Sequence, residues 1–312
     1  MELGHHALHS SATGPESAHP PRWTTGSVER VIDLHTHSTI SDGSEEPERI
    51  VELAHEVGCT AVALTDHDSL AGLARARVRA AELGIRLVAG CEVACVPVAT
   101  GGVHVLVYFV DDPSSPLGLE LDRLRDDRRV RNLELVERLN HLGVPVTFDQ
   151  VTAHAGSDEG VGRPHFAQAM VDLGVVGSVE EAFDRYLSNG GLAYVPKGRL
   201  TVADVCRAAS ESGGVAVLAH PRTMGLEGDA LADAVRGMAE VGLGGLEAVY
   251  GRYSPPTRTG LGNLARRFGL VPTGGSDFHG ATKPDLFVGT GTGDLKVPDR
   301  VLDQLDAMRP TG

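Results

Sequence analysis

The sequence predicts an α/β protein whose parallel sheet is interrupted by a block of helices. Short apolar runs alternate with helical patterns over residues 31–92, and the alternation returns after residue 200. Such alternation is typical of strand–helix–strand units on a parallel sheet. Over residues 116–195 the pattern is helical only. One α/β domain with a helical insertion explains this order better than two consecutive domains.

The elements of the first half follow from the spacing of apolar residues. We expect strands at 31–34, 60–66 and 86–92, and helices at 47–58 and 70–84. Pro47 suits a first helical turn, and Gly58 and Gly84 stand just past the expected helix ends. Next in the chain, two further strands at 93–100 and 103–110 are expected to be joined by a Gly-Gly turn.

The insertion and the second half are predicted in the same way. Within the insertion we expect helices at 119–143, 149–156, 163–174 and 178–191. Ser178 and Glu181 form a plausible capping box for the last of these. After the insertion, helical patterns at 201–214 and 256–269 alternate with strand runs at 215–221, 245–250 and 270–280.

Composition excludes several classes of protein. A net charge of −14 argues against holding duplex DNA, although a small anionic substrate is compatible if metal ions or a few basic residues reverse the local field. No apolar run approaches the length of a membrane span. Residues 1–29 lack the features of a secretory signal and suggest a disordered tail. The four cysteines form no Cys-x-x-Cys pair, so we expect no disulfides and a cytoplasmic location. Nothing points to an obligate protein partner.

Side chains that commonly bind metals follow the predicted strands. They are His35, His37, Asp66, His67, Glu92, His220, Asp277 and His279. In a closed parallel barrel the strand ends meet at one face, where active sites are built. A shared metal site explains this pattern better than unrelated turns. Imidazole and carboxylate ligands without thiolates suit Mn²⁺, Zn²⁺ or Fe²⁺. The ligand types alone do not distinguish these metals, and we take Mn²⁺ as the first choice.

The motifs that carry these residues resemble the PHP (polymerase and histidinol phosphatase) family. In order they are "DLHTHSTISDG", "ALTDHDSLAG", "VAGCEV", "HVLVYF", "GGVAVLAHP" and "GGSDFHG", and they run from His35 to His279. The resemblance implies a distorted (β/α)7-type barrel with two or three divalent metal ions. Residues 30–115 and 196–312 would form the barrel, and residues 116–195 a helical subdomain that covers the active site.

The resemblance also implies a set of metal ligands. His35, His37, Glu92 and Asp277 would hold one ion. Glu92 would bridge to a second ion, held by His104 and His220. Asp42, His67 and His279 would hold a third, with Asp42 standing where some relatives have a histidine. His104 could instead be buried in the barrel wall, and Asp66 is expected to cap or orient the neighbouring His67.

The insertion narrows the expected substrate. "GVGRPHFAQAMV" resembles a motif of PHP phosphoesterases that act on nucleoside 3′,5′-bisphosphates and nucleotide monophosphates, a branch that includes enzymes trimming short RNA 5′ ends. Arg163 and His165 flank Pro164 at an expected first helical turn, which favours phosphate. Lys197 and Arg222 are further candidate phosphate contacts.

The predicted activity is therefore metal-dependent hydrolysis of a nucleotide phosphomonoester, namely the 3′-phosphate of a nucleoside 3′,5′-bisphosphate, or AMP. A hydroxide bridging two ions would attack phosphorus. Asp277 is expected to be essential, and either His220 or a metal-bound water would protonate the leaving group. The alternatives are a 5′-3′ exoribonuclease on short RNA, a histidinol phosphatase and a non-catalytic metal-binding module.

Overall fold

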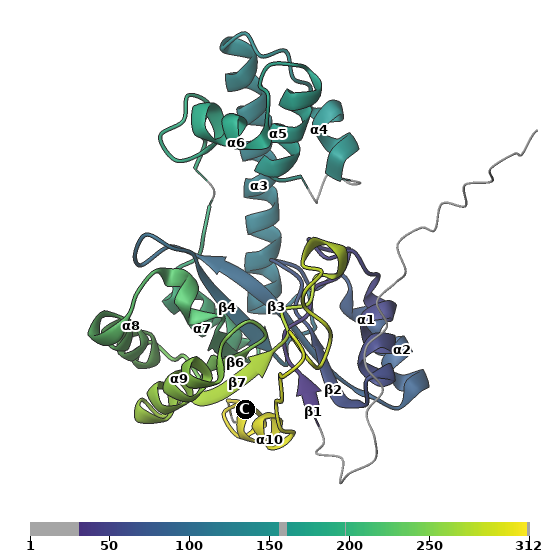
Figure 1. Ribbon diagram of the computed structural model, residues 1–312, viewed down its shortest axis with the longest axis vertical. Helices are drawn as coiled ribbons and strands as arrows, with labels where there is room; N and C mark the ends of the chain where they lie inside the picture. Colours follow the sequence, from purple (N-terminus) through teal and green to yellow (C-terminus); the bar gives the residue numbers. More distant parts are fainter. Residues whose placement is uncertain (1–30, 156–160, 197, 311–312) are drawn as a thin grey trace, which may run out of the picture.

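Within the residues described by the computed structural model, 31–155, 161–196 and 198–310, seven strands form one mixed sheet that curls into a nearly closed barrel (Figure 1). The strands are β1 (Val31–Asp33), β2 (Cys59–Leu64), β3 (Arg86–Cys95), β4 (Val103–Tyr108), β5 (Val215–Leu218), β6 (Gly245–Tyr250) and β7 (Val271–Gly275). They pair in sequence order. All neighbours are parallel except that β4 is antiparallel to β3 and β5. The expected tail and Lys197 lie outside the described residues.

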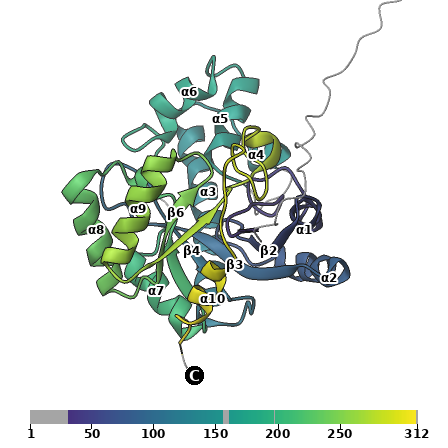
Figure 2. The same cartoon turned by 60° about the horizontal axis from the view of Figure 1, so that its bottom comes forward.

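Helices surround the barrel on its outer side (Figure 2). They are α1 (Pro47–Glu56), α2 (Leu73–Leu83), α7 (Val202–Glu211), α8 (Gly228–Glu240), α9 (Pro255–Arg267) and α10 (Arg300–Asp306). Pro47 begins α1, and Gly84 ends α2 in the left-handed conformation, as expected from their intrinsic preferences. The α/β fold predicted from the sequence is thus confirmed.

The barrel closes where the chain beyond β1 meets β7 and the residues after it. The Leu34 amide donates to the Gly274 carbonyl at 3.3 Å, and the Asp277 amide donates to the His35 carbonyl at 2.8 Å. Gly275 permits this approach, because a Cβ placed on it would lie 2.4 Å from the Cβ of His35. Closure therefore places the residues after β1 beside those after β7.

The block of helices between β4 and α7 projects from the barrel on α3 (Figure 1). Its elements are α3 (Pro116–His141), α4 (Phe148–Ala155), α5 (Arg163–Asp172), α6 (Val179–Ala182) and the π-helical turn η1 (Phe183–Leu187). Leu117 and Leu121 at the start of α3 pack into the barrel core, whereas Leu135 and Leu139 pack into a second core shared with α5. We propose that residues 116–195 form an inserted subdomain tied to the barrel by this one long helix.

Several local expectations need correction. The link between β3 and β4 spans residues 96–102 rather than a two-residue Gly-Gly turn, and Glu92 lies inside β3 rather than at its end. The helix expected at 178–191 stops at Leu187. Ser178 accepts from the Glu181 amide, but the Glu181 carboxylate accepts from the Gly177 amide, so only half of the capping box forms. Across the described ranges, no helix is long and apolar enough to cross a membrane.

Candidate metal centre

The structure brings the nine predicted metal ligands together. Their side chains fall into overlapping groups whose donor atoms lie within 4.8 Å of one another. The groups are His35, His37 and Asp277; His35, Glu92 and His220; His67, Glu92 and His104; and His37, Asp42, His67 and His279. Residues from β3 and β4 and from the loops after β1, β2, β5 and β7 thus meet at one place.

Glu92 lies at the centre of the cluster. Its Oε1 is 3.0 Å from His104 Nδ1 and 2.9 Å from His220 Nε2. Its Oε2 is 3.2 Å from His37 Nε2 and 3.3 Å from His67 Nδ1. Because each oxygen faces a different set of imidazoles, this carboxylate is placed to join two ions. His104 faces the cluster and is not buried in the barrel wall.

The spacing of the donor atoms suits divalent ions. His35 Nε2 and His37 Nε2 lie 3.1 Å apart, and each lies 3.4–3.5 Å from Asp277 Oδ1. Two ligands that each sit about 2.1 Å from one ion are separated by roughly 3.0–3.5 Å. The residues present therefore fit a divalent metal held by imidazole and carboxylate groups.

Asp42 joins the most exposed group of the cluster. Its Oδ1 is 3.2 Å from His279 Nε2, and its Oδ2 is 3.7 Å from His67 Nε2. The side chain of Asp42 is 56% exposed, whereas His279 is buried. This group matches the third set of ligands implied by the family resemblance.

Strained backbone marks the same region. In the described chain the non-glycine residues with positive φ are Asp68, Phe109, His220 and Asp277, at 50°, 68°, 24° and 57°. Left-handed backbone in such residues costs free energy and persists where the surrounding fold enforces it. Two of these residues are candidate ligands and a third directly follows His67, so the strain is concentrated at the centre.

The local electrostatics keep the carboxylates ionised. Burial alone would raise the pKa of Glu92, but the surrounding histidines, with His67 and His35 foremost, hold it well below its usual value. Burial likewise opposes ionisation of Asp277, yet His35, His37 and Lys283 lower its pKa. Burial lowers the pKa of His37 to about 3. His37 is thus neutral and able to coordinate a metal at pH 7.

Three residues that the sequence analysis did not single out support the ligands. Glu247, in β6, accepts from His35 Nδ1 at 2.9 Å and from the His220 amide at 2.7 Å. Tyr250 and Lys283 donate to Asp277 Oδ2, at 2.8 and 2.6 Å. Glu247 is fully buried. The signal that could have identified it in the sequence is an acidic residue within the apolar run 245–250.

The role expected for Asp66 is wrong. Its carboxylate accepts from the amide and hydroxyl of Ser38, each at 2.7 Å, and from the hydroxyl of Ser41 at 2.7 Å. It therefore stabilises the loop after His37 rather than orienting the ring of His67.

The residues expected to contact phosphate lie in two places. Arg163 begins α5, donates to the Val195 carbonyl at 3.0 Å and stacks on the Tyr194 ring. His165 accepts from the Gly162 amide at 3.0 Å and so caps the same helix. Arg222 lies two residues after His220 and forms an ion pair with Glu227.

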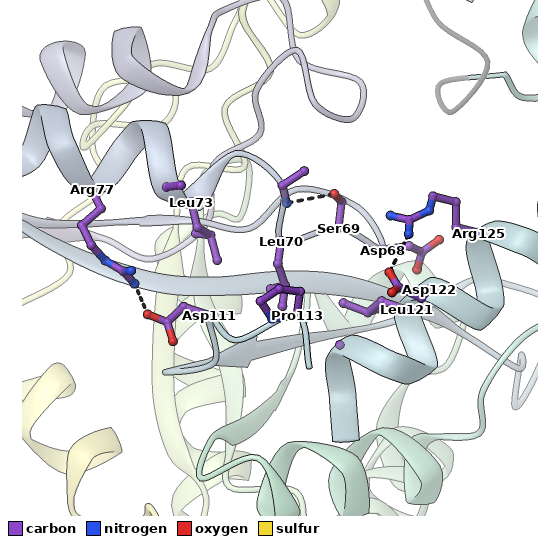
Figure 3. Close-up of a pocket in the computed structure, with 13 residues that line it drawn as sticks. Asp68, Ser69, Leu70, Leu73, Arg77, Asp111, Pro113, Leu121, Asp122 and Arg125 are labelled. Carbon is purple, nitrogen blue, oxygen red and sulfur yellow. Dashed lines mark hydrogen bonds and ion pairs between the residues drawn. The ribbon is translucent and has the colours of Figure 1, made fainter. Parts of the chain in front are cut away.

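A separate cavity of about 370 Å³ lies beside the centre, between α2 and α3 (Figure 3). It is bordered by Asp68 and lined by apolar side chains such as Leu73 and Leu121, and none of the nine candidate ligands lines it. An ion pair joins Arg77 to Asp111 in its wall. Because no candidate ligand lines it, this cavity is distinct from the metal centre.

A barrel that gathers histidines and carboxylates in this way has the architecture of a metal-dependent hydrolase. Residues 33–138 match the family model described as PHP domain. The 5′-3′ exoribonuclease Rnm of Escherichia coli K12 is 34% identical, over 80% of this chain and 85% of the relative. The 3′,5′-nucleoside bisphosphate phosphatase of Chromobacterium violaceum is 32% identical, over 80% of this chain and 87% of the relative. The chain belongs to the PHP family and is a hydrolase of the phosphoesterase class.

Relatives of similar identity carry different activities. The phosphoribosyl 1,2-cyclic phosphate 1,2-diphosphodiesterase of Eggerthella lenta is 32% identical, over 80% of this chain and 94% of the relative. Among solved structures, a metal-dependent phosphoesterase from Bifidobacterium adolescentis aligns with a TM-score of 0.72 at 32% identity, covering 90% of this chain and 97% of its own. An amidohydrolase from Chromobacterium violaceum with bound sulfate aligns with a TM-score of 0.71 at 30% identity. The alignment covers 90% of this chain and 98% of the amidohydrolase.

Proposed function

We propose that this phosphoesterase removes the 3′-phosphate from nucleoside 3′,5′-bisphosphates, with AMP as a second substrate. The observation that carries the proposal is the cluster of nine imidazole and carboxylate side chains around Glu92. Such a donor set suits hydrolysis of a phosphate ester assisted by two or three divalent ions, Mn²⁺ first and Zn²⁺ or Fe²⁺ as alternatives. The relative named as a bisphosphate phosphatase supports the choice of substrate.

The protein side chains would position the ions and the substrate. Divalent ions held there would supply Lewis-acid stabilisation of phosphoryl oxygens and a water molecule of lowered pKa. Asp277 would present Oδ1 to the centre, while Tyr250 and Lys283 fix its other oxygen. Arg163, His165, Lys197 and Arg222 remain proposed phosphate contacts, of which Lys197 lies outside the described residues.

His220 is better suited to hold a metal than to protonate the leaving group. Its Nε2 faces Glu92 at 2.9 Å, and its Nδ1 is 3.0 Å from the hydroxyl of Thr223. Both ring nitrogens are therefore engaged. We propose that the proton reaches the leaving alkoxide from water and that His220 acts as a ligand.

A 5′-3′ exoribonuclease is the second candidate, favoured by the 34% identity to the Escherichia coli enzyme over most of both chains. It would use the same centre on a phosphodiester. Histidinol phosphatase would likewise share the chemistry but act on a substrate with one phosphate.

The proposed function is tested by analysing the products formed by the full-length protein loaded with Mn²⁺. Adenosine 3′,5′-bisphosphate, AMP, histidinol phosphate and a 5′-phosphorylated RNA hexamer are incubated separately, and products are resolved by chromatography. We expect the bisphosphate to yield AMP and phosphate fastest. Stepwise shortening of the hexamer at a higher kcat/KM would favour the exoribonuclease instead.

The matched variants are Asp277→Asn and Asp285→Asn. Asp277→Asn removes a charge from the centre and is expected to abolish turnover, while Asp285 lies at the surface paired with Arg252. Phosphate release from none of the substrates by the wild-type protein would refute the proposal. Unchanged turnover by Asp277→Asn would refute the role of the centre in hydrolysis. Metal binding by the wild-type protein without any turnover would instead favour a non-catalytic metal-binding module.

A further inference from the structure

A second cavity, of about 590 Å³, lies between the helices α9 and α10 and over the strands β6 and β7, all labelled in Figure 1. None of the nine candidate metal ligands lines it. Ligand sites in proteins usually have volumes of roughly 300–1,000 Å³. This cavity therefore has room for a small organic molecule at a place separate from the metal centre.

The charges in the wall of this cavity are all positive. Arg258 and Arg266, on α9, and Arg300, which begins α10, line it, and no acidic residue of the described chain does. Elsewhere on the surface, arginines such as Arg236 and Arg252 form ion pairs with carboxylates. Because the whole chain carries a net charge of −14, three arginines around one cavity without an acidic residue favour an anionic ligand.

The two arginines on α9 have N–H groups left to donate. Arg266 donates to the neutral side-chain amide of Asn263 at 3.0 Å. Arg258 forms an ion pair with Asp294, yet its buried Nε has no hydrogen-bond partner among the described residues. A Cβ added to Gly262 would lie 3.6 Å from both terminal nitrogens of Arg266, so that guanidinium lies back along α9, toward the turn that carries Arg258.

The rest of the wall is largely apolar. Val249 and Val271 come from the strands, Val301 from α10, and Met308 from the residues after α10. Apolar surface beside arginine suits a ligand with an apolar or planar body, because contact with the valines removes that body from water and a guanidinium stacks on planar groups. A simple inorganic anion would use the arginines alone.

We propose that this cavity binds a small organic anion. Its carboxylate or phosphate oxygens would accept hydrogen bonds from Arg258, Arg266 and Arg300, since the guanidinium fork matches both groups. Its apolar body would pack on Val271 and Val301. The site does not depend on the reaction proposed for the metal centre, so either can be tested without the other.

The test uses 8-anilinonaphthalene-1-sulfonate, a fluorescent anion with an aromatic body, titrated into the Mn²⁺-loaded full chain. Arg266→Met combined with Arg300→Met is compared with Arg267→Met combined with Arg236→Met. All four arginines are exposed, and the second pair lies outside the cavity, so both variants lose the same charge. Melting temperatures within a few degrees of the wild-type value confirm that both variants fold.

We expect the dissociation constant of the dye to rise at least tenfold in the variant lacking Arg266 and Arg300, the usual effect of losing charged hydrogen bonds. The control variant should stay within twofold of the wild-type protein. Hydrogen exchange of the wild-type protein locates the dye without any substitution, and its binding should protect α9 and α10. Equal affinities in the two variants, or protection confined to other elements, would overturn the proposal.

Competition identifies the anionic group of the ligand. Naphthalene-1-carboxylate and naphthalene-1-phosphonate share one aromatic body, and the phosphonate has no ester to hydrolyse. Displacement of the dye by the carboxylate assigns the site to organic carboxylates, and displacement by the phosphonate assigns it to organic phosphates. Inorganic sulfate should need at least a tenfold higher concentration. Displacement by sulfate as readily as by the organic anions, or by neither organic anion, would contradict the proposed ligand class.

Discussion

Glu92 shows how one residue can organise a whole centre. It is almost fully buried, and its two oxygens face His104 and His220 on one side and His35, His37 and His67 on the other. A carboxylate placed in this way can be shared between ions that would otherwise repel each other. The residues that orient the histidines around Glu92 should then influence the affinity of the centre for ions.

Glu247 is the clearest of these supporting residues. Replacing it with Gln keeps its size but removes the charge that orients His35 and the backbone of His220. We expect Glu247→Gln to weaken Mn²⁺ binding by about 10- to 100-fold, as is usual for residues that support metal ligands. Calorimetric titration measures this, with the exposed Glu240→Gln as the control. Affinity within twofold of the wild-type value would contradict the assignment.

Metal binding should release a proton at pH 7. Although burial opposes it, Glu247, Glu92 and Asp277 raise the pKa of His35 well above its usual value, so the metal-free protein holds a proton there. An incoming ion must displace that proton, and affinity should therefore increase with pH until the raised pKa is passed. Titrating Mn²⁺ in two buffers of different ionisation enthalpy should reveal a net release of protons. Identical heats in both buffers would refute this.

The strand-end pattern identified seven of the nine residues of the cluster, and the family resemblance added Asp42 and His104, but neither identified the residues that support them. Ligands stand out because His-x-His and Ser-Asp-x-His follow apolar runs, whereas Tyr250 and Lys283 are ordinary residues whose side chains reach Asp277 only after folding. The loop serines that hold Asp66 could not be inferred for the same reason. Contacts across many residues depend on the three-dimensional path of the chain.

At the scale of elements, the junction of β1 with β7 positions His35 opposite Asp277. Gly275→Ala should push β7 away from His35 and destabilise the protein by about 1–3 kcal/mol, the range for overpacked sites. Thermal unfolding measures the loss. The control is Gly260→Ala within α9, where an added Cβ meets nothing within 4 Å and where Ala favours the helix by roughly 1 kcal/mol. Equal melting temperatures for the two variants would contradict the role of Gly275.

Most elements were predictable because their apolar spacing and end signals agree. The helix α8 was left unassigned although Leu231, Val235 and Met238 recur at helical spacing on its buried face. The length of the β3–β4 link was not predictable, because Gly101 packs against the backbone of Thr223 from a distant loop. Short-range turn preferences cannot show such a contact.

At the scale of the molecule, the centre joins segments from both halves of the chain. Ions bound there should stabilise the barrel as a whole, because they bind the folded state only. Removing them with a chelator should lower the melting temperature by about 5–10 °C, as expected for ions present at roughly 100 times their dissociation constant. Adding Mn²⁺ should restore it. An unchanged melting temperature would show that the cluster does not hold ions in the folded protein.

The insertion shows where sequence reasoning stops. Its helices and the motif around Arg163 were evident, but Arg131 resembled one basic residue among many in the run 123–131. Arg131 is buried where α3 passes between the two cores, and no local pattern encodes that packing. Burial of this kind cannot be inferred from the sequence of α3 alone.

The most direct test of the central claim is the number of metal ions bound by the full chain. Protein saturated with Mn²⁺ and freed of excess by gel filtration is measured by mass spectrometry of its metal content, beside Asp277→Asn prepared in the same way. A centre built by the nine side chains should retain two or three ions per chain, and the variant should retain fewer. At most one ion in the wild-type protein, or equal content in both proteins, would contradict a shared multi-metal centre.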